Sequence, residues 1–362
     1  MKRMLCITAN MNAGGAETFL MKVYRCLDRN EYQMDFCVSV NENTYADEIE
    51  KMGGKLYIVP AKTKQPFKAF YSIKDIVKEN NYMSVMRVNE HSLATIDLLA
   101  AKCGGAEKLI MRSSNSSSDG KISSYLHRLF RILPQNIPTV KIAPSKLAAE
   151  YTFGSKKANK EVKILKNGLN IDEYSYSEEN RVQLRKELLI EDKFVVGHVG
   201  RFNKQKNHEF LIEIFYEFQK NRSDAVLVLV GDGILMEKIK QKVIELGIED
   251  KCIFTGVRRD VNKLLSAMDV FVFPSLYEGM PNTVIEAQTT GLNCLISDSI
   301  THEADVIGSV EYMSLMKSSK EWADRLLKIS KEKFNRNVAS EKMRQQGYDI
   351  KDVTREFIKL VY

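Results

Sequence analysis

Runs with strand character alternate with runs of helical periodicity from one end of this chain to the other. Arg3–Ala9, for example, is an apolar run of strand length, and Glu17–Leu27 follows it with apolar residues at helical spacing. The alternation pauses over Val162–Glu191, where Lys166–Asp172 is rich in turn formers, and it restarts at Lys193–Val199. Such alternation predicts parallel sheets covered by helices on both faces. The chain is therefore expected to be α/β, with two doubly wound units.

The length of 362 residues agrees with two units, because a single hydrophobic core rarely grows beyond about 250–300 residues. We predict a first Rossmann-like domain over residues 1–166 and a second over residues 167–344, facing each other across a cleft. Ligands of doubly wound sheets bind outside the carboxyl ends of the strands. The cleft is therefore the expected binding site.

The composition is that of an ordinary globular protein, with 44% hydrophobic and 28% charged residues. No stretch reaches the roughly 20 apolar residues of a membrane-spanning helix, and the apolar part of Met1–Asn10 is too short for a signal peptide. None of the six cysteines lies in a CxxC pair or near a histidine at metal-ligand spacing. We interpret them as reduced thiols of a cytoplasmic protein.

The net charge of +7 is unevenly distributed. Residues 1–166 hold 26 Lys and Arg against 16 Asp and Glu, whereas residues 167–362 hold 28 against 31. A basic half suggests an anionic partner, either a membrane surface or a phosphate-bearing acceptor. A solvated basic face without a partner is the alternative. Nucleic acid is not expected, since no nucleic-acid-binding motif is present.

One helix candidate, Ile122–Leu133, combines an apolar face with basic residues around its other side, namely Lys121, His127, Arg128 and Arg131. This pattern is typical of a helix that lies on a membrane surface. An amphipathic helix packed on its own domain gives the same pattern, so both interpretations stay open.

A glycine turn, Asn12–Glu17, directly follows the first predicted strand and opens a helix. Gly14 and Gly15 would let the backbone approach a phosphate closely, and the start of a helix favours negative charge. The spacing is not GxGxxG, so a nicotinamide cofactor is not indicated. A purely structural turn is the alternative.

A basic turn, Val199–His208, lies where strand gives way to helix at the start of the second domain. Arg201 and Lys206 flank this turn at the carboxyl end of the strand. Two cations at such a place suit a diphosphate, although a solvated basic loop would have the same composition.

An acidic constellation, Pro274–Glu286, places two carboxylates, Glu278 and Glu286, eight positions apart around a glycine-containing loop and a helix start. Carboxylates can accept hydrogen bonds from sugar hydroxyls, and an acid on an apolar helix is costly to bury unless it is paired. We expect Asn282 and Thr283 to cap the helix. The amides of this loop are expected to form an anion site, and its residues are Gly279, Met280, Pro281, Asn282 and Thr283.

Together these features resemble the retaining glycosyltransferases of family 4, which have the two-domain GT-B fold. The family's E-x7-E motif corresponds to Glu278 and Glu286. Further similar stretches are Gly14–Glu17, Asn167-Gly168, Gly200-Arg201 with Lys206-Asn207, Phe254–Gly256 and Asp269–Ser275. The end of the chain is similar to the family's closing helix, so the resemblance implies that residues 345–362 complete the first domain. Within the family, the sequence is most similar to the bacterial group of exopolysaccharide or capsule biosynthesis.

The resemblance also implies roles for these residues. Arg201 and Lys206 would hold the donor diphosphate, with help from amides near Gly15 and Gly279. Glu286 would bind the ribose, and Glu278 would bind the transferred sugar. Residues around Thr255–Arg258 would border the base. No metal is expected, because the cations take its place and no Asp-x-Asp occurs.

One departure from the family concerns the first domain, where many members carry a histidine. The corresponding stretch here is Met111–Asn115, with Arg112 and Ser114 at the histidine positions. Arg112 could still stabilise phosphate charge and is taken as a catalytic candidate. On the acceptor side the candidates are Glu17, His91 and Asn115, although a packing role for His91 is equally compatible with its position.

The leading hypothesis is a transferase that moves a hexose, with retention, from a nucleotide-diphosphate sugar to a glycan or lipid-linked acceptor of a surface polysaccharide. The resemblance favours a uridine donor, with guanosine as the alternative. Two other functions stay open, a non-catalytic nucleotide-sugar binding module and a sugar-nucleotide epimerase of the same fold.

Overall fold

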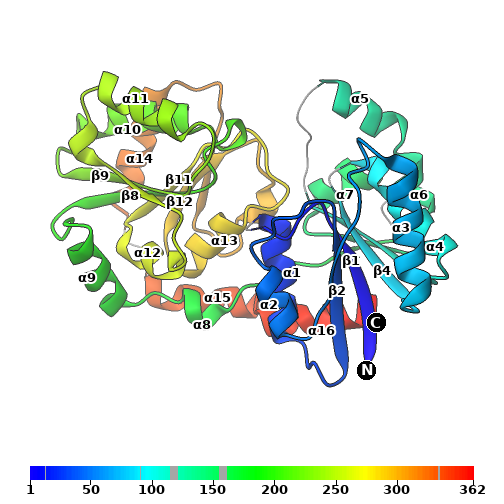
Figure 1. Cartoon of the computed structure of the whole chain (residues 1–362). Helices are drawn as coiled ribbons and strands as arrows, with labels where there is room; N and C mark the ends of the chain where they lie inside the picture. The colour runs from blue at the N-terminus through cyan, green and yellow to red at the C-terminus, as the bar shows by residue number, and fades with distance from the viewer. Residues whose placement is uncertain (13, 90, 115–120, 155–160, 333–334) are drawn as a thin grey trace. The chain divides into compact units, whose positions relative to one another are not determined.

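The computed structural model describes residues 1–12, 14–89, 91–114, 121–154, 161–332 and 335–362. It divides into two compact units (Figure 1). Unit 1 comprises Met1–Gly168 together with Tyr348–Tyr362, and unit 2 comprises Leu169–Gly347. The divisions thus fall two and three residues from the expected ones, and the expected return of the chain to the first unit begins at Tyr348.

Unit 1 is built on a parallel sheet in the order β3-β2-β1-β4-β5-β6-β7. Its strands are β1 (Lys2–Ile7), β2 (Tyr32–Val38), β3 (Leu56–Ile58), β4 (Ser84–Asn89), β5 (Lys108–Ser113), β6 (Val140–Ala143) and β7 (Val162–Ile164). The helices are α1 (Gly15–Cys26), α2 (Ala46–Lys51), α3 (Pro66–Glu79), α4 (Ile96–Cys103), α5 (Lys121–Leu129), α6 (Ile132–Asn136), α7 (Lys146–Phe153) and α16 (Ile350–Val361), with a 3₁₀ turn η1 (Ser92–Thr95).

Unit 2 repeats this design with a parallel sheet in the order β10-β9-β8-β11-β12-β13. Its strands are β8 (Phe194–Val199), β9 (Ala225–Val230), β10 (Cys252–Gly256), β11 (Val270–Phe273), β12 (Asn293–Ser297) and β13 (Val310–Met313). The α-helices are α8 (Ile171–Tyr174), α9 (Glu178–Glu187), α10 (His208–Gln219), α11 (Met236–Glu245), α12 (Val261–Ala267), α13 (Asn282–Thr289), α14 (Ser319–Ile329) and α15 (Ala339–Gln345). The 3₁₀ turns are η2 (Lys204–Lys206), η3 (Glu249–Lys251), η4 (His302–Ala304) and η5 (Arg336–Val338).

The apolar runs of the sequence form these sheets because a parallel strand is covered on both faces. All six residues of β9, for example, are buried. In each sheet the strand order reverses once, between β1 and β4 in unit 1 and between β8 and β11 in unit 2. Loops at such a reversal separate at the carboxyl ends of the strands and leave room for a ligand. The expected α/β fold with two Rossmann-like sheets is confirmed.

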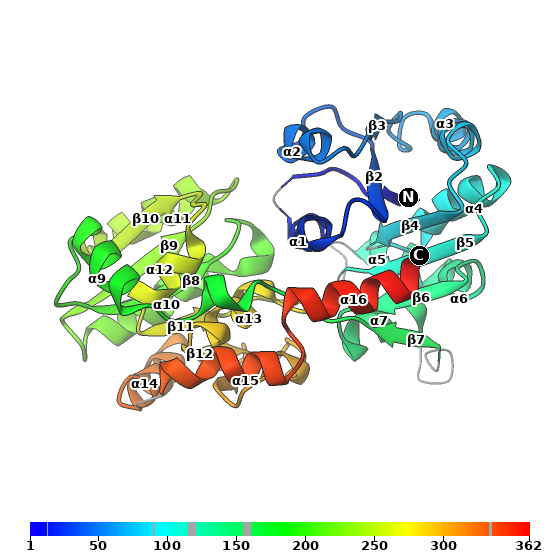
Figure 2. The same cartoon turned by 90° about the horizontal axis from the view of Figure 1, so that it is seen from below.

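The last helix, α16, completes the core of unit 1, and Figure 2 shows it in red beside the strands of that unit. It packs on α1 and buries Val353, Phe357 and Val361. Its end is fixed by two hydrogen bonds, because Ser84 Oγ donates to the Val361 carbonyl at 2.6 Å and Tyr362 Oη donates to the Gln33 carbonyl at 2.8 Å. The two chain ends therefore share one core.

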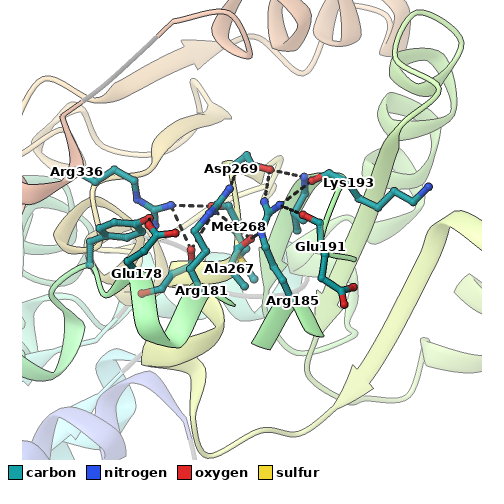
Figure 3. A network of polar contacts seen from close by, with 12 residues as sticks. Glu178, Arg181, Arg185, Glu191, Lys193, Ala267, Met268, Asp269 and Arg336 are labelled. Carbon is teal, nitrogen blue, oxygen red and sulfur yellow. Dashed lines mark hydrogen bonds and ion pairs between the residues drawn. The ribbon is translucent and has the colours of Figure 1, made fainter. Parts of the chain in front are cut away.

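Three arginines form a polar network at the start of β11 in unit 2 (Figure 3). Arg181 and Arg185, both on α9, pair with the Asp269 carboxylate at 2.5 and 2.6 Å, and Asp269 also accepts from the Val195 amide at 2.7 Å. Arg336 donates to four carbonyl oxygens, those of Leu265, Ser266, Met268 and Thr290. The network thus satisfies carbonyl groups at the end of α12, which would otherwise be left without donors.

The structure differs from the sequence predictions about helices in two places. No helix was predicted in the boundary stretch Val162–Glu191, but it contains α8 and α9 besides the strand β7. Helix α9 has no regular apolar pattern, because Arg181 and Arg185 make many of its contacts with the rest of unit 2. Its helical character could therefore not be predicted from apolar periodicity. The single helix expected over Ile122–Leu133 is two helices, α5 and α6, which a turn at Phe130-Arg131 separates. Among the described helices none is both long enough and apolar enough to span a membrane.

Candidate active site

The central contact of the candidate site joins Lys206 to Glu278 in unit 2. Lys206 Nζ lies 2.6 Å from Glu278 Oε1, and the two side chains are 17% and 10% exposed. The ammonium group also lies 4.6 Å from the centre of the Phe273 ring. Lys206 follows β8 and Glu278 follows β11, the two strands at which the order of this sheet reverses. The pair therefore occupies the place where doubly wound sheets bind ligands.

The turn that carries Lys206 is fixed by side chains of its own sequence. Asn203 Oδ1 accepts a hydrogen bond from the Lys206 amide at 3.1 Å and so caps η2. Asn207 adopts the left-handed conformation, with φ 54° and ψ 45°, a conformation that asparagine tolerates better than most residues. Its Nδ2 donates to the Pro274 carbonyl at 3.2 Å.

Two further hydrogen bonds tie this turn to the loop after β11. The Leu276 amide donates to the Gln205 carbonyl at 2.8 Å, and Gln205 Nε2 donates to the Tyr277 carbonyl at 2.9 Å. Glu278 itself makes a parallel bridge to Ile300. The lysine and the glutamate thus belong to one hydrogen-bonded frame rather than to two independent loops.

Glu286 lies on α13, the helix that the acidic loop opens, and it is 7% exposed. The expectation that Asn282 and Thr283 cap this helix is wrong. The N-cap position is Pro281, whose backbone is extended, and no side chain makes a capping hydrogen bond there. Thr283 Oγ1 is buried without a hydrogen-bond partner in the described part of the chain. A helix start is nevertheless a place at which anions bind in proteins.

Two glycines bring the backbones after β8 and β9 into direct contact. Gly231 has φ +136°, and a Cβ atom there would overlap the carbonyl oxygen of Gly200. Gly233 has φ +156°, and its Cβ would lie 2.5 Å from the carbonyl oxygen of Phe202. Neither conformation suits a side chain. These glycines were not predicted as site residues, although their position directly after the apolar run Ala225–Val230 was a possible signal.

A stack of rings lies beneath Lys206. His208 stacks on Phe202 with 4.0 Å between ring centres and meets the edge of His198 at 4.7 Å, and His198 in turn stacks on Phe273. Burial lowers the pKa of His198 to about 4 and that of His208 to about 2. Both imidazoles are therefore neutral at pH 7, and Lys206 is the charged member of this group.

Arg201, the other predicted cation of this turn, is exposed directly after β8. Its guanidinium makes no ion pair with any residue that the structure describes. Arg258 differs, because its guanidinium lies 2.7 Å from Asp260 and 2.9 Å from Glu187. The hydrogen bond to Asp260 is the main reason why the pKa of Arg258 is raised. Its expected place beside a nucleobase stays a prediction.

In unit 1, Gly14 is the N-cap of α1 and Gly15 its first residue. No side chain caps this helix start, but a Cβ on Gly14 would overlap the carboxylate of Glu17, which also accepts a hydrogen bond from Thr8 Oγ1 at 3.1 Å. A carboxylate thus lies close to the amides that were predicted to receive a phosphate. Negative charge is favourable at this place, so Glu17 has a structural role that the sequence analysis did not assign.

Arg112 is almost completely buried in unit 1, at 1% exposure. It donates to Asn167 Oδ1 at 2.5 Å, and its guanidinium lies 3.9 Å from the centre of the Phe19 ring. Burial lowers its pKa to about 10, so it stays protonated at pH 7. Arg112 therefore links β5 to α1 and to Asn167, near the end of the Met1–Gly168 segment of unit 1. This packing role was not predicted from the sequence.

Two acceptor-side candidates remain. His91 Nδ1 accepts a hydrogen bond from the Leu93 amide at 3.3 Å and caps η1, and its ring meets the edge of His127 at 5.5 Å. This is the packing role that was the alternative for His91. Asn115 lies outside the described residues. No group of three His, Cys, Asp or Glu side chains within the described ranges could hold a metal ion.

The two parallel sheets define the class of fold, an α/β fold of GT-B architecture. The crystal structure of Anabaena Alr3699/HepE in complex with UDP-glucose superposes with a TM-score of 0.81, at 17% identity, and covers 99% of each chain. WaaG, a glycosyltransferase involved in lipopolysaccharide biosynthesis, does so with a TM-score of 0.73 at 14% identity, again over 99% of each chain.

Sequence comparison adds the family. Residues 180–349 match the model of glycosyl transferases group 1. EpsF of Bacillus subtilis (strain 168), which is named as a glycosyltransferase, is 31% identical over 358 residues, or 96% of this chain and 93% of that protein. The chain therefore belongs to the group 1 glycosyltransferases. It is also 34% identical over 142 residues (38% of this chain and 36% of the other) to the UDP-Gal:alpha-D-GlcNAc-diphosphoundecaprenol alpha-1,3-galactosyltransferase of Escherichia coli.

Proposed function

We propose that this glycosyltransferase moves a hexose from a UDP-sugar to a glycan or lipid-linked acceptor in surface polysaccharide biosynthesis, with retention of configuration as in family 4. The observation that carries the proposal is the Lys206–Glu278 pair, which the chain follows directly with the start of α13 and the buried carboxylate of Glu286. A cation, two buried carboxylates and a helix start are what a sugar joined to a diphosphate requires.

In this proposal the donor diphosphate lies against Lys206 and Arg201. As the bond between sugar and diphosphate breaks, negative charge grows on the departing oxygen, and the two cations stabilise it. Lys206 is partly buried, so its charge acts in a medium of low polarity, where electrostatic stabilisation is larger than in water. These cations supply the positive charge that a divalent metal supplies in other transferases. We therefore propose a reaction that needs no metal.

Glu278 and Glu286 orient the donor. When the donor binds, Lys206 turns its charge toward the diphosphate, and the Glu278 carboxylate accepts hydrogen bonds from the hydroxyls of the transferred sugar. Glu286 accepts hydrogen bonds from the ribose. The acceptor hydroxyl then attacks on the face from which the diphosphate leaves, which retains the configuration. Unit 2 is thus the donor-binding domain and unit 1 the acceptor-binding domain.

The names of relatives support the donor and the acceptor class. One relative from Escherichia coli is named for UDP-galactose and a diphosphoundecaprenol acceptor. Another, from Campylobacter jejuni, is named for a diphospho-undecaprenol acceptor and is 27% identical over 37% of this chain. Both names describe sugars added to a lipid-linked diphosphate. With such an acceptor, we propose that the enzyme acts at the cytoplasmic face of a membrane.

The proposal is tested by calorimetry with UDP-glucose, UDP-galactose, UDP-N-acetylglucosamine and GDP-mannose. We expect micromolar binding of one UDP-sugar and at least a tenfold loss in Glu286→Ala. Glu237→Ala is the control, since Glu237 is a glutamate of the same unit on α11 with 84% of its side chain exposed. Binding without release of UDP, even with acceptors present, would support a non-catalytic module instead. Equal turnover with EDTA and with added Mg²⁺ is expected, and dependence on Mg²⁺ would refute the metal-free reaction.

Membrane association is a separate proposal that rests on α5 and α6. Tyr125, Leu129 and Ile132 are 67%, 59% and 63% exposed, and Arg128 lies among them. Exposed apolar side chains beside a cation suit the surface of an anionic bilayer. The protein should float with vesicles that contain phosphatidylglycerol at low salt. The double variant Leu129→Ser, Ile132→Ser should float less, and unchanged flotation would exclude this surface.

A further inference from the structure

Unit 1 contains a cavity of about 180 Å³ at the carboxyl ends of β1 and β2. Its floor is apolar and is formed by Ile7, Cys37, Val38, Val59 and Ile73. A volume of this size equals about six water molecules, and it is smaller than the roughly 300 Å³ at which pockets for drug-sized ligands begin. The cavity therefore suits one substituent of a larger ligand rather than a whole ligand.

One wall of the cavity carries two cations, Lys62 and Arg87. Both contact the same buried oxygen, Asp97 Oδ2, which lies 2.7 Å from Arg87 Nε. Arg87 Nη1 donates to the carbonyls of Ile7 and Val88 at 3.0 and 2.6 Å, so this side chain is fixed. Lys62 comes instead from the segment between β3 and α3, and its side chain is 34% exposed.

The wall holds more positive than negative charge. Two cations share one carboxylate, which leaves a surplus of one positive charge beside an apolar floor. Burial and the charge of Arg87 lower the pKa of Lys62, although Asp97 opposes this shift. An ammonium group has three donors, and Asp97 needs one of them. A bound anion would therefore both balance the surplus charge and use donors that Asp97 leaves available.

The cavity also borders the glycine turn. Thr8 lines it and donates a hydrogen bond to Glu17 of that turn at 3.1 Å. Both features lie within unit 1, so this neighbourhood does not depend on unit 2.

We propose that this cavity is an acceptor subsite, in which Lys62 and Arg87 bind a phosphate group of the acceptor while the floor contacts the attached organic group. A phosphodiester, or a phosphate within a diphosphate linkage, carries one negative charge, which equals the surplus on the wall. The inference rests on the proposed transferase function and adds to it the recognition of the acceptor by charge.

The first test compares two acceptors that differ only in charge. One is N-acetylglucosamine joined through a diphosphate to a short lipid chain, and the other is the same sugar joined directly to that chain. Lys62→Met should raise the KM for the diphosphate acceptor at least tenfold, leave the KM for the neutral acceptor unchanged and leave kcat and the KM for the donor nearly unchanged. Lys62→Arg should restore most of the loss. Lys64→Met is the control, since Lys64 is exposed on the same segment and does not line the cavity.

An equal effect on both acceptors, or no effect on either, would overturn the proposal. A second test does not depend on catalysis, so it remains decisive if no transfer is found and the proposed function fails. Inorganic phosphate and octyl phosphate are titrated into the full chain and followed by NMR. An acceptor subsite is supported if octyl phosphate binds more tightly than inorganic phosphate and if Lys62→Met abolishes this binding. Equal binding of both would indicate a free-phosphate site, and no binding would overturn the inference.

Discussion

The carboxylate of Glu278 holds the ammonium group of Lys206 at 2.6 Å, with both side chains largely shielded from water. Such a pair neutralises the cation, so in the proposed reaction the donor diphosphate has to take over the contact with Lys206. Because the two charges face each other across two loops of one hydrogen-bonded frame, a change at either residue alters the other.

Replacement of Lys206 by Met should lower kcat by about 10²–10³, because one preorganised partner of the leaving diphosphate is lost. Glu278→Gln should lower kcat as well, yet it should leave the affinity for free UDP unchanged or raised, since Lys206 then lacks its internal partner. Steady-state kinetics and calorimetry with UDP measure both effects. Lys204→Met, on the exposed side of the same turn, is the control, and an equal loss in this variant would show that only the general charge of the turn matters.

The ring stack beneath Lys206 should make unit 2 sensitive to acid. The unfolded chain protonates His198 and His208 near their ordinary pKa of 6.5, whereas the folded chain resists protonation down to about 4 and about 2. The free energy of unfolding should therefore fall as the pH drops below about 6.5, by up to about 1.4 kcal/mol per pH unit for each histidine.

The fluorescence of Trp322 reports this unfolding, because it is the single tryptophan of the chain and lies in the core of unit 2. Urea titrations of wild type and of His208→Phe at pH 7.5, 6.0 and 5.0 measure the effect. The free energy of unfolding of the variant should depend less on pH, because the contribution of one histidine is missing. Identical pH dependence in both proteins would show that other groups cause the acid sensitivity.

Arg336→Met should destabilise unit 2 by about 3 kcal/mol, because the carbonyls of Leu265 and Thr290 lose their donor, while those of Ser266 and Met268 keep Arg181. Urea titrations followed by the fluorescence of Trp322 measure this loss of stability. Arg325→Met is the matched control, since Arg325 pairs with Glu311 with 41% of its side chain exposed, and an exposed pair contributes about 0–1 kcal/mol. A loss below 1 kcal/mol in Arg336→Met would mean that water replaces the guanidinium at this place.

Phe357→Ala on α16 should destabilise unit 1 by about 3–5 kcal/mol, the usual cost of a large cavity in a core. Hydrogen exchange of the β1 and β4 amides in the full chain should accelerate accordingly, while the Trp322 transition of unit 2 should keep its midpoint. Lys359→Ala, on an exposed position of the same helix, should change neither signal. A common loss in both units would show that they unfold as one.

The strands and most helices could be predicted because burial on both faces of a sheet leaves apolar runs in the sequence. Helix α9 could not, because Arg181 and Arg185 dock it on Asp269 and on backbone carbonyls. Contacts of this kind depend on three-dimensional position and leave no periodicity. For the same reason Asp269 was identified within the stretch Asp269–Ser275, but its ion pairs with Arg181 and Arg185 were not predicted.

The candidate site was predictable to a similar degree. The placement of Lys206 and Glu278 after the carboxyl ends of β8 and β11, and of Glu286 on the helix that follows, was expected from the sequence. Their frame did not, because it depends on Asn203, Gln205 and Asn207, polar residues that any loop could contain. The charged wall of the cavity was also beyond the sequence, since Lys62, Arg87 and Asp97 come from three separate segments.

The return of the chain to unit 1 affects the order of folding. Synthesis makes the first 168 residues before unit 2, yet the helix that covers part of their core, Ile350–Val361, is made only after unit 2. Unit 2 can therefore fold on the ribosome while unit 1 is still incomplete, with the surface of α1 uncovered. The nascent protein has a period in which its second half is folded and its first half is open to chaperones, to proteases or to another copy of itself.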